Sequence, residues 1–167
     1  TTDGSNGNVL VGQAIYNNGA NYIYNGNVIQ VSGNGLPATV NNLTIDNNLG
    51  VKLSNTALTV TGTLLINSGK KLDLEAGKQL SVNGTLTNNA GATGLVIESN
   101  ATGTGSLIHS TAGVAATVER YIVGHGSVAT DGWHLIGSPV ATFNIDGSSF
   151  DPGANDDIYA WNEATNT

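Results

Sequence analysis

Cysteine is absent from this 167-residue chain, and charged side chains are scarce. Without cysteine the fold holds no disulfide bond, and thiol chemistry and cysteine-based metal sites are excluded. Charged residues make up 10% of the sequence, against about 25% in an average soluble domain. The formal net charge is −7, and only five residues are lysine or arginine. Because nucleic acids and anionic membranes bind to clustered cations, we expect neither to be a partner.

Long apolar runs are missing as well. No stretch of 18 apolar residues occurs, so we expect no transmembrane helix. Residues 1–5 lack the basic start and the apolar run of a signal peptide. Glycine, asparagine, threonine and serine take the place of the charged residues. A surface rich in hydroxyl and amide groups is typical of many secreted β-proteins, and we expect an extracellular or cell-surface location.

A short apolar unit recurs along the chain at a nearly constant interval. Leu43–Ile45, Leu64–Ile66 and Leu86–Asn88 form one series, Val51–Leu53, Leu72–Leu74 and Leu95–Ile97 a second, and Leu58–Val60 and Leu80–Val82 a third. Within a unit the flanking residues are mostly apolar and the middle one is variable, which is the period of a β-strand. Three interleaved series with one period predict an all-β fold, a right-handed parallel β-helix. We expect a three-faced solenoid with about 21–22 residues per coil.

The same register extends toward the N-terminus. Tyr22 and Tyr24 stand one period before the first series, and Ile29 and Val31 stand one period before the second. An earlier apolar piece, Val9–Val11, precedes the latter pair by nearly one further period and is expected to form a cap strand or a partial coil. We therefore expect about four coils between residues 9 and 110.

The connections between the apolar units also repeat. Gly62 and Gly84 stand at the same step of one corner, where we expect a positive φ to allow a sharp bend. The third series reappears as Leu107–His109 only after an interval longer than the period, so residues 98–105 are expected to form a protruding loop. Stacked corners align like residues, and axial amide ladders are expected from three asparagines: Asn47, Asn48 and Asn67.

The pattern of apolar residues changes near residue 113. Longer apolar alternations follow, with both tryptophans nearby, and these favour an antiparallel sheet or sandwich. We therefore divide the chain into a β-solenoid over residues 1–112 and the incomplete beginning of a β-sandwich over residues 113–167. The strand expected at 157–162 has no partner strand after it, so we expect the remainder of a longer chain or a neighbouring subunit to supply one.

Several segments resemble large surface proteins of Bacteroidota. They are ATVNNLTIDN at 38–47, the repeats LTVTGTLLINSG and LSVNGTLTNNAG, VERYI at 118–122, GWHLIGSPV and DIYAWNEATNT. In such proteins β-helical repeats precede a β-sandwich region, and the far C-terminus carries a type IX secretion sorting domain. The resemblance implies export across the outer membrane by the type IX secretion machinery, followed by display on the cell or release from it. It covers most of the chain and implies no particular activity.

Four aspartates crowd a short loop rich in glycine, serine and asparagine: Asp146, Asp151, Asp156 and Asp157. Calcium takes six to eight oxygen ligands, and such a loop could supply carboxylates and backbone carbonyls. The spacing matches neither an EF-hand nor a nonapeptide calcium repeat. A solvated acidic loop is therefore the favoured interpretation, with calcium as the alternative and no other cofactor expected.

No catalytic constellation emerges from the sequence. Asp73 and Glu75 form the only close carboxylate pair within the regular coils, and Lys70, Lys71 and Lys78 lie next to them. Surface ion pairing explains this group, since a polysaccharide-degrading site would also need a positioned base and a basic or metal partner. The three histidines are scattered. We therefore expect no enzyme activity.

These observations favour a non-enzymatic extracellular module with a structural or adhesive role, a β-solenoid stalk of a bacterial cell-surface or secreted protein. Two alternatives stay open. One is a carbohydrate-binding or carbohydrate-active segment, in which surface glycans stack on four aromatic residues: Tyr22, Tyr24, Trp133 and Trp161. The other is a self-assembling extracellular fibre subunit, in which the unpaired strand accepts a strand from a neighbour.

Overall fold

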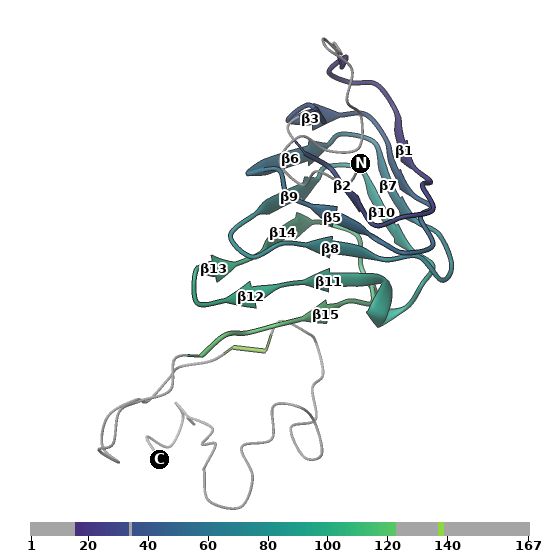
Figure 1. Cartoon of the computed structure of the whole chain (residues 1–167). Helices are drawn as coiled ribbons and strands as arrows, with labels where there is room; N and C mark the ends of the chain where they lie inside the picture. The colour runs from purple at the N-terminus through teal and green to yellow at the C-terminus, as the bar shows by residue number, and fades with distance from the viewer. Residues whose placement is uncertain (1–15, 34, 123–136, 139–167) are drawn as a thin grey trace, which may run out of the picture. The chain divides into compact units, whose positions relative to one another are not determined.

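The computed structural model describes residues 16–33, 35–122 and 137–138 of the chain. Its strands run from Tyr22 to Val118, and they belong to the first of two units, whose boundary falls between Gly132 and Trp133. The strands wind as a parallel β-solenoid of about four coils, as the repeat predicts (Figure 1). The all-β solenoid expected from the sequence is therefore confirmed.

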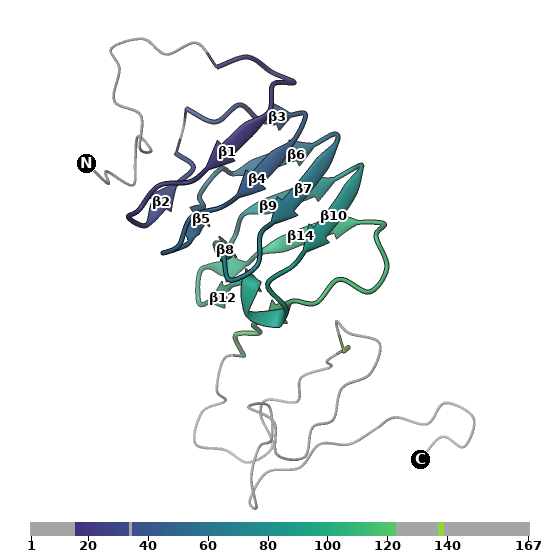
Figure 2. The ribbon, with the colours of Figure 1, turned by 90° about the vertical axis from the view of Figure 1, so that its right-hand side faces the viewer.

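Three parallel sheets form the sides of the solenoid. The first contains β1 (Tyr22–Tyr24), β4 (Leu43–Ile45), β7 (Thr63–Ile66) and β10 (Thr85–Asn88). The second contains β2 (Gln30–Val31), β5 (Val51–Leu53), β8 (Leu72–Leu74), β11 (Leu95–Ile97) and β15 (Thr117–Val118). The third contains β3 (Thr39–Val40), β6 (Ala57–Val60), β9 (Gln79–Val82) and β14 (Ser106–His109). Figure 2 shows β1, β4, β7 and β10 side by side as successive rungs of one sheet.

The predicted period equals the sequence separation between residues that pair on neighbouring strands. Leu43 pairs with Leu64 and Leu64 with Leu86 in the first sheet. Leu58 pairs with Leu80 in the third sheet. A residue and its counterpart one coil later therefore lie on neighbouring strands, about 4.8 Å apart. Residues in the same place on successive strands form columns along the solenoid axis.

Apolar side chains fill the interior. In the central coils buried and partly exposed residues alternate, as in Val51–Leu53, because successive side chains point to opposite faces of a strand. The buried apolar side chains are all leucine, isoleucine or valine among the described residues. One coil has too few of them to enclose a core by itself, so each coil depends on its neighbours for burial.

Six core columns run along the interior, two for each sheet. The first sheet supplies Tyr22, Leu43, Leu64 and Leu86, and also Tyr24, Ile45, Ile66 and Asn88. The second supplies Gln30, Val51, Leu72 and Leu95, and also Ser32, Leu53, Leu74, Ile97 and Val118. The third supplies Leu58, Leu80 and Leu107, and also Val40, Val60, Val82 and His109. Apolar residues hold the middle of every column, and polar groups stand at several of the ends.

The register expected for the first coil is wrong by one residue. The sequence pattern predicted Ile29 and Val31 inside, but Gln30 pairs with Val51 and Val31 pairs with the outward-facing Lys52. Ile29 is consequently 48% exposed, and Gln30 occupies the interior position. Hydrogen bonds made by the Gln30 side chain support this register. A pattern of apolar and polar residues does not reveal such bonds.

Gly62 and Gly84 do not have the positive φ expected from the sequence. They stand instead where successive coils approach each other closely. A Cβ atom on Gly84 would overlap the carbonyl group of Gly62, and one on Gly62 would lie 2.9 Å from the carbonyl oxygen of Asn41. Glycine is therefore needed here for space, whereas positive φ values occur at other corners, as at Gly50 and Gly69.

The predicted loop at residues 98–105 contains an antiparallel hairpin, formed by β12 (Ser99–Asn100) and β13 (Gly103–Thr104). It projects on the left of Figure 1. The Asn100 side chain closes the turn, because it accepts hydrogen bonds from the amide and the hydroxyl of Thr102 at 2.8 and 2.6 Å. Beyond the hairpin, β14 pairs with β9 in register, so the extra residues leave the ladder intact. The predicted protruding loop is confirmed.

The parallel ladder reaches beyond residue 112. β15 pairs with β11 in parallel, and Val118 lies opposite Ile97. The β-sandwich predicted for residues 113–167 falls mostly on residues outside the described part of the chain, as does the strand predicted at Val9–Val11. Both stay predictions.

Amide hydrogen bonds run along the axis, but their partners differ from those expected. The side-chain amide of Asn67 donates to the carboxylate of Asp46 at 3.0 Å, so Asn67 stacks on an aspartate and not on Asn47. The amide of Asn47 donates in turn to the side-chain oxygen of Gln30 at 2.8 Å. Both asparagines thus bond to an acceptor in the preceding coil that is not an asparagine, and the ladder predicted from Asn47, Asn48 and Asn67 is wrong.

Candidate functional site

Six of the eight residues predicted to bind a ligand lie outside the described residues. They are Asp146, Asp151, Asp156, Asp157, Trp133 and Trp161. Calcium binding by the acidic loop and sugar stacking on the tryptophans therefore stay predictions. The other two residues, Tyr22 and Tyr24, lie on β1.

Tyr22 and Tyr24 face the interior of the first coil, where they pack against the apolar core. The hydroxyl of Tyr22 donates to the carbonyl oxygen of Asn17 at 2.9 Å, and that of Tyr24 donates to the carbonyl oxygen of Ser32 at 3.4 Å. The ring of Tyr22 also lies 6.2 Å from the ring of Tyr16, tilted by 46°. Both core-facing rings are partly buried, so each presents only part of its surface to a sugar.

Burial raises the pKa of the Tyr24 phenol above its ordinary value, and the phenols of Tyr16 and Tyr22 raise it further. The pKa of Tyr22 is also raised, first by burial and then by Tyr16. Both phenols therefore stay protonated at neutral pH and donate to backbone carbonyls. A group held in this way serves the fold and is unsuited to take up a proton as a general base.

Three glutamates occupy the same position in successive coils of the second sheet. Glu75, Glu98 and Glu119 directly follow β8, β11 and β15, and we call them the glutamate ladder. The backbone amide of Glu98 donates to Leu74 at 3.0 Å and that of Glu119 donates to Ile97 at 2.9 Å. The sequence contains the signal for this ladder, because the glutamates recur at the same period as the apolar units.

The glutamate ladder brings negative charges together along the axis. Burial raises the pKa of the Glu98 carboxyl, and the neighbouring carboxylates of Asp73, Glu119 and Glu75 raise it further, while Lys52 opposes them. The carboxylate of Glu119 is partly satisfied, because the backbone amide of Ser99 donates to it at 3.2 Å. Repulsion between these carboxylates therefore destabilises the folded chain at neutral pH, and protonation of the ladder reduces this cost.

The ion pair predicted for Asp73 is present. Asp73 lies on the outer face of β8, is 8% exposed, and its carboxylate is 2.7 Å from the ammonium group of Lys71. On the first sheet's side of the same corner, Lys70 lies 3.9 Å from Asp46 and also donates to the side-chain oxygen of Asn48. Two of the five cations are thus paired with aspartates within the solenoid.

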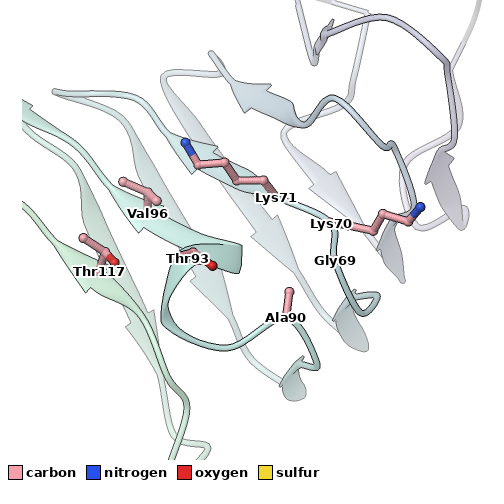
Figure 3. Close-up of a pocket in the computed structure, with 7 residues that line it drawn as sticks. All are labelled: Gly69, Lys70, Lys71, Ala90, Thr93, Val96 and Thr117. Atoms are coloured by element: carbon pink, nitrogen blue, oxygen red, sulfur yellow. The ribbon is translucent and has the colours of Figure 1, made fainter.

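A shallow open pocket of about 400 Å³ lies beside this corner (Figure 3). Its lining consists of Gly69, Lys70, Lys71, Ala90, Thr93, Val96 and Thr117. Thr93 belongs to the 3₁₀ turn η1 (Ala92–Gly94), which precedes β11. In Figure 3 the two lysine side chains extend in different directions, and both are engaged by the partners named above. What remains is methyl and hydroxyl groups, which offer no acid–base pair.

His109 ends one of the core columns. It lies on β14 directly beside Val82, with its side chain partly buried in an interior position. Its Nδ1 atom is buried and has no hydrogen-bond partner among the described residues. Within the same residues, no group of three or more histidine, cysteine, aspartate or glutamate side chains is arranged to hold a metal ion.

The outer face of the third sheet is largely polar, and the described part of the solenoid has no net charge. On the third sheet Thr39, Thr59 and Ser81 stack as an outward-facing column. Between residues 16 and 122 the five basic side chains are matched by five acidic ones, and the net negative charge of the chain lies outside this range. Such faces can form hydrogen bonds along their length and exert little long-range attraction on charged partners.

The described surface therefore offers many hydrogen-bonding groups, while its acidic side chains either form ion pairs with lysines or belong to the glutamate ladder. No helix among residues 16–33, 35–122 and 137–138 is long and apolar enough to cross a membrane. Comparison with protein-family models, with curated proteins and with solved structures finds no match to this chain.

Proposed function

We propose that the chain is a structural module without enzyme activity, a β-solenoid stalk that belongs to a bacterial cell-surface or secreted protein. The observation that carries this proposal is the unbroken register of the three parallel sheets. Leu43, Leu64 and Leu86 follow one another without a gap in the first sheet. The second sheet continues over five strands. Such an arrangement is suited to hold a shape and to space other parts of a protein.

The energetics of stacking support a mechanical role. Each central coil buries about six apolar side chains, and burial of one contributes about 1.5–3 kcal/mol. That gain is realised only when the coils above and below are in place. Side-chain bonds between coils add to it, such as that from Asn67 to Asp46. Pulling on one coil is therefore resisted by its neighbours, which is the property required of a stalk.

The extracellular location is supported by the composition and by the resemblance to Bacteroidota surface proteins. Immunogold labelling of intact, non-permeabilised cells of the source bacterium tests it directly. We expect gold particles on the outer surface or in the shed material, and removal of the epitope by an added protease. Labelling that appears only after permeabilisation would overturn the proposed location.

The hydroxyl-bearing column on the third sheet favours one competing function, binding of glycans. Columns such as Thr39, Thr59 and Ser81 present hydroxyl groups at regular intervals. A glycan array probed with the full chain, together with a turnover assay on polysaccharides, distinguishes the two functions. A passive stalk binds no glycan above background and releases no product. Saturable binding would favour the carbohydrate-binding alternative.

A further inference from the structure

We propose that Asn100, at the turn of the hairpin formed by β12 and β13, is an acceptor site for an N-linked glycan. The donor is an oligosaccharide attached to a lipid diphosphate, and the catalyst is an oligosaccharide transferase that acts on the folded chain. The site is a property of the hairpin, so it goes beyond the proposed stalk function and does not depend on it.

The sequence contains three N-x-S/T segments, the acceptor signal for N-linked glycosylation. They begin at Asn42, Asn83 and Asn100, and none has proline in the middle position. Such segments also arise by chance in a chain rich in asparagine and threonine, so the three-dimensional setting decides which of them a transferase can use. A usable acceptor is an exposed asparagine on a segment that can enter an active site without unpairing the fold.

The segment at Asn100 meets this requirement. Asn100, Ala101 and Thr102 are all exposed at the tip of the hairpin. The two strands of the hairpin pair with each other, and Asn100 lies opposite Gly103. The ladder of the third sheet continues from β9 to β14 without them. The turn can therefore enter the active site of an enzyme while the coils keep their register.

Thr102 prepares the Asn100 side chain for the reaction. Its hydroxyl and its backbone amide donate to the Asn100 side-chain oxygen at 2.6 and 2.8 Å. The nitrogen of a carboxamide is a weak nucleophile, because its lone pair is delocalised into the carbonyl group, and it becomes stronger when it loses a proton. The oxygen then takes up the negative charge, which two donors already in place stabilise. Among the described residues no acceptor engages the Asn100 side-chain nitrogen, so this nitrogen is free to react.

The transfer exchanges one bond to the sugar for another. The Asn100 side-chain nitrogen bonds to the anomeric carbon of the glycan, the bond from that carbon to the diphosphate oxygen breaks, and the diphosphate leaves with the electron pair. One proton of the amide passes to a base of the transferase. The linked amide keeps its carbonyl oxygen, so the product retains an acceptor for both Thr102 donors.

Asn42 is held by the fold. Its side-chain nitrogen donates to the side-chain oxygen of Asn21 at 2.8 Å, and its side-chain oxygen accepts the backbone amide of Thr63 at 2.6 Å. Leu43, the middle residue of this segment, is fully buried. A transferase could reach Asn42 only after the corner had opened and a core leucine had left the interior.

Asn83 is exposed, but its segment is tied to the preceding coil. The backbone amide of Asn83 donates to the carbonyl of Val60 at 2.9 Å, and that of Thr85 donates to the carbonyl of Gly62 at 3.1 Å. Gly84, between them, lies so close to Gly62 that it leaves no room for a side chain. Exposure alone therefore does not make this asparagine accessible to an enzyme.

The test incubates the purified full chain with an oligosaccharide on a polyprenyl diphosphate and with a single-subunit transferase that requires only the N-x-S/T signal. Mass spectrometry of the glycopeptides gives the occupancy of each asparagine. We expect a glycan at Asn100, and at Asn42 and Asn83 at most about a tenth of its occupancy, because their segments must first open locally. The matched reference is the tryptic peptide 79–120, which carries Asn83 and Asn100 without the fold and should accept glycan at both.

Three variants of the full chain test the chemistry of the turn. Thr102→Ala removes the hydroxyl donor and should abolish the transfer, whereas Thr102→Ser keeps the donor and should retain it. Asn100→Gln removes the acceptor and should leave the folded chain without a glycan. An unchanged circular dichroism spectrum shows that each variant keeps the solenoid.

Absence of a glycan at Asn100 in the folded wild-type chain would overturn the proposal, whether or not the peptide accepts one. Equal occupancy of Asn83 and Asn100 in the folded chain would overturn it as well, because the fold would then not select the site. Immunogold labelling tests the location of the stalk separately. A chain found only inside the cell but glycosylated at Asn100 by the purified transferase would contradict the location and leave the acceptor site in place.

Discussion

Gly84 stacks on Gly62 in the preceding coil, and the two backbones lie so close that a Cβ atom on Gly84 would overlap the carbonyl group below it. The neighbouring amide of Thr85 donates to that carbonyl at 3.1 Å, which ties the two coils together at this corner. A side chain at position 84 would force the coils apart and break this bond. Overpacking of this kind costs about 1–3 kcal/mol.

We therefore expect Gly84→Asn to lower the free energy of unfolding by about 1–3 kcal/mol, measured by urea denaturation. Gly69→Asn is the control. Gly69 has a positive φ of 72°, and nothing lies within 4 Å of an added Cβ atom. Asparagine tolerates this conformation, so a change of less than about 1 kcal/mol is expected. Equal losses in the two variants would contradict the role of space at Gly84.

Tyr24 gives the solenoid a sensitivity to alkaline pH. Its pKa is raised above the ordinary value of 10.0, first by burial. Above about pH 10 the phenol of the unfolded chain loses its proton while that of the folded chain keeps it, so stability falls as the pH rises. Tyr24→Phe should flatten this decline, which urea midpoints between pH 8 and pH 11 would measure. At neutral pH only the weak bond to Ser32 is lost, at about 1 kcal/mol or less. An unchanged decline in the variant would exclude Tyr24 as its cause.

At the scale of the strand and its corner, the second sheet accumulates like charges. The glutamate ladder places one carboxyl group after each of β8, β11 and β15. Stacked like charges repel each other across a distance of about 4.8 Å, the separation of neighbouring strands. Lys52 offsets part of this repulsion at Glu98. The coils that carry the glutamate ladder are therefore held together against electrostatic repulsion, which a lower pH relieves by protonating the carboxylates.

Glu98, the central member of the glutamate ladder, determines whether stability rises or falls with pH. Because the pKa of Glu98 is raised above 4.5 in the folded chain, the folded state binds its proton more tightly than the unfolded state does. The associated stability is present at acidic pH and is lost as the pH rises through the folded pKa. We expect Glu98→Gln to raise the urea midpoint at pH 7 and to reduce its change between pH 4 and pH 7.

The control for Glu98→Gln is Asp46→Asn, which removes a carboxylate at a corner away from the ladder. It removes one negative charge and leaves the ladder in place, so it measures the effect of net charge on the pH dependence. If both variants flattened the profile equally, net charge and not the ladder would be responsible.

The strands that could be predicted from the sequence are those of the central coils. There the interior is uniformly apolar, as at Leu72 and Leu74, so the spacing of apolar residues equals the spacing of the strands. The first coil could not be predicted in the same way, because the side-chain bonds of Gln30 decide its register. At Gly62 the residue was recognised but the reason was not, since close approach of two coils is a property of the stacked backbone.

The candidate site was less predictable than the fold. The pairing of Asp73 with a neighbouring lysine follows from closeness in the sequence and is confirmed. Glu98 and Glu119 come together only after the coils are stacked, so a search for neighbouring carboxylates along the sequence does not find them. A search at the repeat period would have done so.

For the molecule as a whole, stability is shared between coils. Leu72 lies in the central part of the second sheet, pairs with strands on both sides and is fully buried. Loss of such a residue leaves a cavity that three coils line, and no single coil can relax to fill it. We therefore expect a local truncation to weaken the solenoid as a unit.

Leu72→Ala should lower the free energy of unfolding by about 2–5 kcal/mol, as followed by far-ultraviolet circular dichroism in urea. Leu49→Ala makes the same chemical change at a corner where the side chain is 59% exposed, and it should alter stability by no more than about 0.5 kcal/mol. A small effect at both positions would show that the interior is not tightly packed.

The hairpin of β12 and β13 adds residues to one coil, yet β14 still pairs with β9 as though nothing had been inserted. This corner thus accommodates an insertion. A foreign epitope or a small folded domain spliced into the turn at Ala101 and Thr102 would be carried outward while the rungs kept their alignment. In protein engineering this corner is a natural grafting position, and in evolution it is a place where the length of the chain can vary without rebuilding the scaffold.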